Sequence, residues 1–156
     1  MFGKLKPTEI EQVLKAGVIG HLASHADDRT YIVPISYAYD GTYVYGHTHE
    51  GLKVNMMRKN PMVCFEVDDT RDMANWKSVI AWGDFEELPK GARRKKALRQ
   101  LLNRQLPPNH SETVELSDEF PFMPEDTNTI EGVVFRIKLE EKTGRFESNS
   151  VAPLLA

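Results

Sequence analysis

The feature that most constrains the fold is a series of short segments in which apolar and polar residues alternate, separated by turn residues. Residues 31–39 alternate in this way, so every second side chain lies on one face of a predicted strand. Asp40-Gly41 is a strong hairpin signal and joins this strand to a returning strand over 42–47. Pro34 cannot donate a ladder hydrogen bond, which indicates a sheet edge or a bulge. Short strands joined by turns favour a closed or nearly closed barrel.

The whole chain reads as about six strands and three helices in mostly antiparallel order, within one domain over residues 1–156. Thr8 and Glu11 have the spacing of a capping box at the start of the first helix. We expect a turn over 25–29, a polar loop over 69–75 and a long proline-rich ordered loop over 107–129. The predicted strands are 18–23, 31–39, 42–47, 62–68, 77–87 and 131–140, and the predicted helices are 8–15, 50–59 and 92–106.

Composition excludes several classes of function. Lys and Arg number 20 and Asp and Glu number 23, so the net charge of −3 provides no global basic field for nucleic acid. The lone Cys64 excludes an intrachain disulfide framework, and we expect it in the core rather than as a nucleophile. No apolar run approaches the ~18 residues that span a bilayer. We therefore expect a cytoplasmic protein that binds neither nucleic acid nor membrane.

The segment 45–53 carries the most chemical information, because it runs from a strand end into a helix start. The first N–H groups of a helix have no partners inside the helix and favour anions such as phosphate. Thr48 adds a hydroxyl, Gly51 permits close approach to the backbone and Lys53 adds a positive charge. This pattern fits a phosphate cradle, and it equally fits an ordinary strand–helix turn with a solvated lysine.

Two further patterns invite functional interpretations. His47 and His49 point the same way if they lie in a strand, as two ligands of one metal ion would. The third ligand that such a motif needs is absent from the following residues, so we expect no metal site. The basic run 93–96 fits a solvated helix face, or a docking patch for an anionic partner.

Five segments, taken in order, resemble a known family. They are Val33-Pro34-Ile35-Ser36-Tyr37, a Tyr-x-His-x-x-x-Gly-x-Lys pattern from Tyr45 to Lys53, Arg58-Lys59-Asn60-Pro61, Val63-Cys64-Phe65-Glu66, and residues 76–86. This set resembles the FMN-binding split-barrel family related to pyridoxamine 5'-phosphate oxidase, over about residues 8 to 140. Within that family it is most similar to the branch that includes 5-nitroimidazole resistance proteins.

The resemblance implies a six-stranded antiparallel split β-barrel with flanking helices, and a homodimer with two FMN sites at the subunit interface. It places the backbone of Val33, Pro34 and Ile35 along the flavin ring. It also places residues around the rest of the cofactor: His47 and Thr48 on the ribityl-phosphate side, Lys53 on the phosphate, and Ser78, with Lys77, on a neighbouring strand.

The chain departs from the oxidases proper, which carry an arginine where Tyr31 stands, another where Leu52 stands, and an arginine-containing C-terminal motif that is missing here. We therefore do not expect oxidation of pyridoxamine phosphate. Arg29, Arg58 or a residue of the partner subunit is a candidate to replace the lost phosphate contacts.

The function that the resemblance implies is an FMN-dependent oxidoreductase that passes electrons from NAD(P)H to a small-molecule substrate such as a nitroaromatic or a quinone. The alternative is a non-catalytic protein that binds a flavin or haem, and a deazaflavin is a further cofactor used by this fold. A third interpretation is an interaction module that uses the 107–129 loop and the basic run 93–96.

Overall fold

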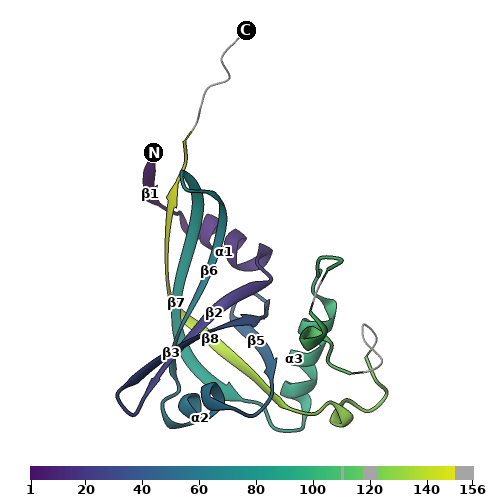
Figure 1. Cartoon of the computed structure of the whole chain (residues 1–156). Coiled ribbons are helices and arrows are strands. Elements are labelled where there is room, and N and C mark those ends of the chain that lie inside the picture. The colour runs from purple at the N-terminus through teal and green to yellow at the C-terminus, as the bar shows by residue number, and fades with distance from the viewer. Residues whose placement is uncertain (110, 118–122, 150–156) are drawn as a thin grey trace.

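An antiparallel sheet curls around the centre of the molecule, and three helices pack against it (Figure 1). The computed structural model describes residues 1–109, 111–117 and 123–149. Its strands are β1 (Phe2–Lys4), β2 (Ile19–Ala26), β3 (Arg29–Ser36), β4 (Ala38–Tyr39), β5 (Tyr43–Thr48), β6 (Met62–Asp72), β7 (Asn75–Glu87) and β8 (Val133–Glu147). Its helices are α1 (Pro7–Ala16), α2 (Leu52–Lys59) and α3 (Ala92–Asn103), with 3-10 turns η1 (Glu112–Val114) and η2 (Thr127–Thr129).

The strand order explains the shape of the sheet. It runs β3-β2-β6-β7-β8-β5-β4, and β1 pairs with β8. The sheet curls far enough to bring β3 into contact with β5. Within the described part of the chain no ladder joins these strands, so the barrel is split along this line. The predicted antiparallel split barrel with flanking helices is confirmed, and the described residues form eight strands instead of six.

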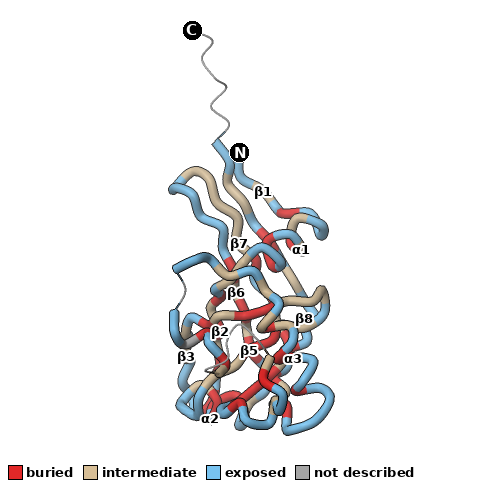
Figure 2. Tube along the Cα trace, turned by 90° about the vertical axis from the view of Figure 1, so that its right-hand side faces the viewer, coloured by how far each residue is buried: buried red, intermediate tan, exposed pale blue. Residues whose placement is uncertain are grey.

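The predicted loop over 69–75 is wrong. There β6 and β7 continue as a projecting hairpin, and only residues 73 and 74 form the turn. Asp72 closes this turn by accepting hydrogen bonds from the Ala74 backbone N–H and the Asn75 amide. Most of the hairpin end is exposed or half-buried (Figure 2). Its strands are therefore held by ladder hydrogen bonds, and the polar sequence carried no burial signal for them.

The boundaries of several other elements differ from the predicted ones. The predicted turn over 25–29 shrinks to Asp27 and Asp28, whose φ angles of 52° and 56° suit a tight hairpin turn. The first helix begins at Pro7, and the Glu9 carboxylate accepts from the Lys6 backbone N–H, so the predicted Thr8–Glu11 capping box is not the one used.

Further along the chain, the predicted strand 31–39 is divided into β3 and β4, and α3 ends at Asn103, before the predicted residue 106. Strand β8 runs to Glu147, beyond the predicted residue 140, because its end pairs with β7 and β1. Parts of the predicted 107–129 loop, at 110 and 118–122, lie outside the described residues.

Two hydrophobic clusters hold the helices to the sheet. One lies between α1 and the central strands and includes Leu14, Phe65 and Ile137, each fully buried. The other lies between α3 and the β4–β5 side of the sheet and includes Leu98 and Val134. The Tyr37 hydroxyl, which is buried, donates to the Leu14 carbonyl at 2.7 Å and ties the end of α1 to the sheet.

A bulge between β7 and β8 requires a glycine. The register shifts between Trp82 and Gly83, opposite β8. A Cβ atom on Gly83 would lie 1.9 Å from the Lys138 carbonyl oxygen. Only glycine permits so close an approach of the two backbones, and the bulge lets the long β8 bend around the barrel.

Candidate functional site

The strand β5 ends at Thr48, and the chain passes through a short turn into α2 at Leu52. The helix has no side-chain cap at Gly51 and no acidic residue in its first turn. A Cβ atom on Gly51 would meet nothing within 4 Å, so the space beside the helix start is open. Gly51 thus leaves the helix start without a side-chain cap and with open space beside it, as an anion site needs.

The three cationic side chains of α2 differ in their ion-pair partners. Lys59 Nζ lies 2.6 Å from an Asp27 carboxylate oxygen, and Arg58 is paired with Glu50 and Glu87. Lys53 is half-buried and, among residues that the structure describes, has no ion-pair partner. Lys53 is thus the cation that α2 leaves available for an incoming anion.

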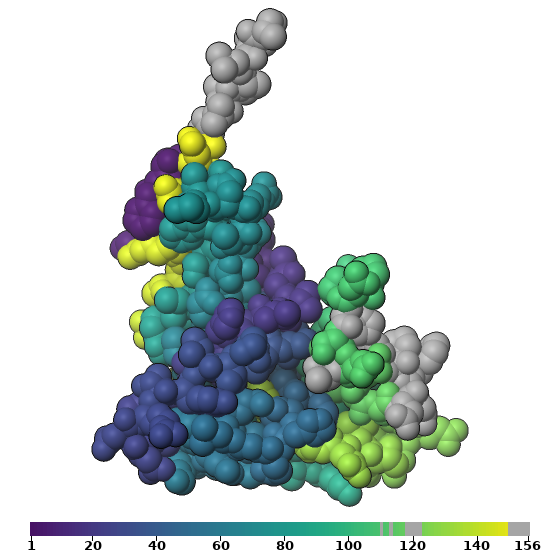
Figure 3. Space-filling view, in the orientation of Figure 1, coloured from purple at the N-terminus to yellow at the C-terminus, as the bar shows by residue number. Residues whose placement is uncertain are grey.

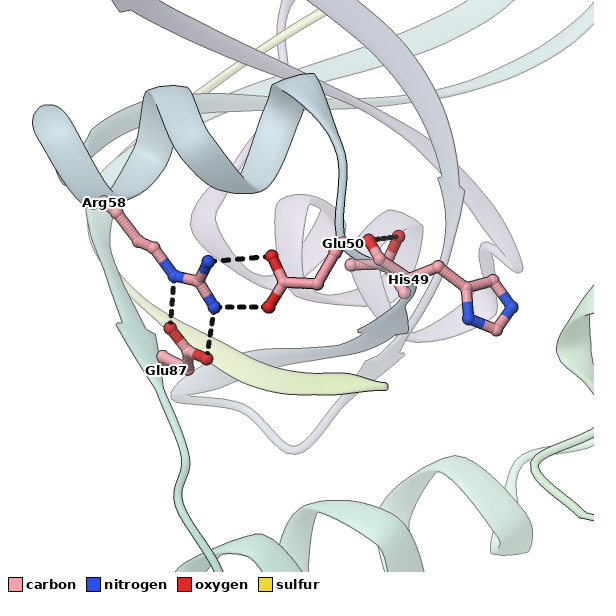
Figure 4. A network of polar contacts seen from close by, with 5 residues as sticks. His49, Glu50, Arg58 and Glu87 are labelled. Atoms are coloured by element: carbon pink, nitrogen blue, oxygen red, sulfur yellow. Dashed lines mark hydrogen bonds and ion pairs between the residues drawn. The ribbon is translucent and has the colours of Figure 1, made fainter. Parts of the chain in front are cut away.

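Arg58 is a structural clamp. Its guanidinium donates two hydrogen bonds to Glu50 and two to Glu87, all at 2.7 to 2.8 Å (Figure 4). These bonds lower the pKa of both carboxyl groups. They also tie the turn before α2 to the end of β7. Because its guanidinium is committed to two carboxylates, we do not expect Arg58 to replace the phosphate-binding arginines of the oxidases.

His47 is held by a backbone contact on the far side of the turn. Its Nε2 lies 2.6 Å from the Glu131 carbonyl oxygen, so Nε2 carries the proton and donates it. Burial lowers the pKa of His47 below its usual 6.5, and the charges of Arg94 and Arg104 lower this pKa further, against the carbonyl contact, which raises it. His47 is consequently neutral at pH 7, with Nδ1 free to accept a hydrogen bond.

Val33, Pro34 and Ile35 lie on β3, the edge strand next to β2. The side chains of Val33 and Ile35 pack against the central core cluster, whereas Pro34 is exposed on the other face. Pro34 and Ile35 line a mostly apolar cavity of about 260 Å³ that also contacts residues 106–114 in part. The prediction of an edge at Pro34 is confirmed.

Lys77 and Ser78 are not brought to the same place. They are neighbours on β7, so their side chains lie on opposite faces of the sheet. Lys77 lines a cavity of about 340 Å³ beside α1, and Ser78 donates to a Glu66 carboxylate oxygen at 2.9 Å. The strands β2 and β6 separate both residues from β3. Within one chain, the β7 residues therefore lie apart from the group on β3, β5 and α2.

A polar network on the outer face of the sheet escaped the sequence analysis. His21 and Glu66 stand opposite each other on β2 and β6, with Nδ1 and Oε2 3.1 Å apart. Their ligand-type atoms and that of Asp68 all lie within 4.8 Å of one another. Glu66 also accepts from Ser78, and Asp68 from Thr70, so hydrogen bonds account for this group. Only the pairing register, which the sequence does not show, brings these residues together.

His47 and His49 have ring centroids 6.0 Å apart. Across the described ranges they join no third His, Cys, Asp or Glu as a metal centre would require. Figure 4 shows the His49 ring pointing away from the Arg58 clamp.

In addition, no helix in the described chain combines the length and hydropathy needed to cross a membrane.

The fold is a split β-barrel, and the model of the family described as pyridoxamine 5'-phosphate oxidase matches residues 6–146. The chain belongs to this family. A solved FAD-binding protein from Mesorhizobium loti is 32% identical with a TM-score of 0.72, covering 95% of this chain and 99% of that one.

Two other relatives extend the comparison. A proposed 5-nitroimidazole antibiotic resistance protein from Bacteroides thetaiotaomicron has a TM-score of 0.71 at 16% identity, covering 94% of this chain and 87% of that one, and shares the fold. An uncharacterized protein of Rhizobium meliloti is 40% identical over 81 residues, 52% of this chain and 54% of that protein. The chain thus spans about half the length of this curated relative.

The lowered pKa of His47 predicts a pH-dependent stability. The unfolded chain binds a proton at the usual pKa of 6.5 and the folded chain does so only at lower pH, so the free energy of unfolding should fall as pH drops through 6.5. Denaturant titrations between about pH 7.5 and 5.5 measure this, with His47→Gln removing the titration. His25→Gln, at an exposed histidine, is the control. Parallel pH curves for wild type and His47→Gln would contradict the assignment.

Proposed function

We propose that this protein binds FMN at the β5–α2 turn and along β3, and works as an oxidoreductase on a small-molecule substrate. The observation that carries the proposal is the open, uncapped start of α2 beside Lys53, which has no ion-pair partner in the described part of the chain. This arrangement suits a phosphate group, which needs N–H donors and a positive charge together. Membership of the family, and a relative described as FAD-binding, support a flavin as the ligand that carries this phosphate.

The residues of the chain fit the other parts of a flavin. The edge strand β3 presents backbone at Val33, Pro34 and Ile35 beside an apolar cavity, where a flat ring can lie. Thr48, half-buried at the end of β5, is next to the phosphate position. A bound flavin supplies the two-electron chemistry, and the protein supplies orientation and electrostatics.

His47 has a defined part in this proposal. Because Nε2–H is committed to the Glu131 carbonyl, only Nδ1 is available to the ligand, as a hydrogen-bond acceptor. Since the one N–H of the neutral ring is bonded to Glu131, His47 has no proton to offer the ligand, and its role is to orient a donor group of the cofactor or substrate. The same contact occupies the nitrogen through which a histidine most directly reaches a haem iron, which favours a flavin over haem.

Lys53→Gln should weaken FMN binding by about 10- to 100-fold, because a charge-assisted hydrogen bond contributes about 1.5–3 kcal/mol. Fluorescence titration of the purified protein with FMN, and in parallel with FAD, measures this. Lys59→Gln removes a charge from the same helix, where Asp27 already pairs with it, and should leave binding unchanged. Equal affinities of the two variants, or no binding of either flavin by the wild type, would refute the phosphate assignment.

The oxidoreductase assignment has its own test. When the flavin-loaded protein is mixed with NADH or NADPH without oxygen, the flavin absorbance should bleach, and a nitroaromatic or quinone should restore it. If the flavin is retained but neither nucleotide bleaches it, the protein is a flavin carrier or a sensor. This outcome would reject turnover with a nicotinamide and leave the binding proposal intact.

We further propose that two copies associate through the outer face of the sheet. The residues opposite each other on β3, β2, β6 and β7 share this face, and four large apolar side chains on it are 37% to 66% exposed: Ile19, Ile32, Met62 and Ile80. An apolar surface of this kind is typical of an interface. A second copy would also bring its own Ser78 toward the flavin, which two strands prevent within one chain.

Ile32→Glu should shift the protein from twice the chain mass toward the single-chain mass at micromolar concentration, because an unpaired carboxylate would be buried in the interface. Sedimentation equilibrium measures the mass. Thr42→Glu, exposed between β4 and β5, introduces the same charge away from this face and should leave the dimer intact. A wild-type protein that sediments at the mass of one chain would overturn the dimer.

A further inference from the structure

A cavity of about 440 Å³ lies between the end of α1, the start of β4 and the end of α3. Figure 3 shows the purple residues of α1 beside the green residues that follow α3. The volume is within the range of small-molecule sites in proteins. The polar lining of the cavity includes Lys15, Tyr37, Tyr39 and Arg104.

Arg104, at the end of α3, is the unusual member of this lining. Its Nε and Nη1 atoms are buried and, within the described residues, have no hydrogen-bond partner. Burial lowers the pKa of Arg104 to about 10, so the guanidinium still carries its charge at pH 7. Buried donors without partners are rare in folded proteins, and a buried charge without a partner is costlier still. Among the residues that the structure describes, no group of the chain therefore pairs with these two donors.

The other lining groups do not supply that partner. No carboxylate lines the cavity among the described residues, while Lys15 adds a second positive charge. The two tyrosine hydroxyls are already committed, since Tyr37 donates to the Leu14 carbonyl and Tyr39 to the Glu11 carboxylate. The side-chain amides of Gln100, Asn103 and Gln105 complete a polar, positively charged wall.

We propose that this cavity binds a small oxyanion, a carboxylate or phosphate group, with Arg104 as its principal ligand. Arginine presents donors on two edges of a planar group, and this geometry suits an anion with several oxygens. The volume admits an organic molecule larger than phosphate alone. The cavity is distinct from the start of α2, because neither Lys53 nor any other residue of α2 lines it, although the charge of Arg104 also acts on His47.

The test uses the full-length protein and two probes, sodium phosphate and sodium benzoate, each replacing sodium chloride at constant ionic strength. The readouts are the thermal unfolding midpoint and the 15N–1H signal of Arg104 Nε, identified by its loss in Arg104→Lys. At least one probe should shift both the unfolding midpoint and the Arg104 Nε signal, and both shifts should saturate as the probe concentration rises. The probe that does so distinguishes an inorganic phosphate site from an organic carboxylate site, and no saturable shift with either probe would overturn the proposal.

Variants separate binding from structure. Arg104→Gln should weaken the binding of the probe that shifts the wild type by about tenfold or more, because the variant loses a charge-assisted contact. Arg99→Gln removes an exposed charge from the same helix and should behave as the wild type does. Without probe, Arg104→Gln should keep or raise the unfolding midpoint, because it removes a half-buried charge whose Nε and Nη1 donors have no partner among the described residues. A lowered midpoint, or an unchanged response to the probe, would show that Arg104 is structural and refute the site.

Discussion

The antiparallel ladder through β2, β6, β7 and β8 is the constraint on which the rest of the structure depends. Because directly opposed residues share a face, one register decides which side chains enter the core and which face outward. It buries Phe65 and Val79 beneath α1, and it places Glu66 and Ile80 on the outer face. A shift of one residue would exchange the two sets, so the core and the polar network depend on the same register.

Charge pairing distinguishes structural cations from candidate ligands. Arg58 and Lys59 have acidic partners that anchor α2 to β7 and to the β2–β3 turn. Lys53 and Arg104 are half-buried and have no acidic partner among the residues described, although burial favours pairing. We interpret Lys53 and Arg104 as two candidate binding positions for an anion. The two lie in different places, which makes the proposed flavin site and the proposed oxyanion cavity separately testable.

The sequence predicted the elements whose signals are local. The hairpin at Asp40-Gly41 is confirmed, and Asp40 accepts from the Thr42 and Tyr43 backbone N–H groups as such a turn requires. The helix cores and the edge at Pro34 also follow from local rules. The hairpin at 69–75 and the far end of β8 did not, because exposed strands held by ladder hydrogen bonds lack the alternation that burial imposes.

For the candidate site, the sequence by itself determined the chemistry of the β5–α2 turn, since Gly51, Lys53 and the helix start are neighbours in the chain. Only the tertiary structure decided the state of each group. Among the described residues, it pairs Arg58, leaves Lys53 without an ion-pair partner and leaves the buried Nε and Nη1 of Arg104 without a hydrogen bond. It also places Lys77 and Ser78 on opposite faces of the sheet. The physical reason is that burial and pairing are set by residues distant in sequence, through strand register and helix packing that no local pattern encodes.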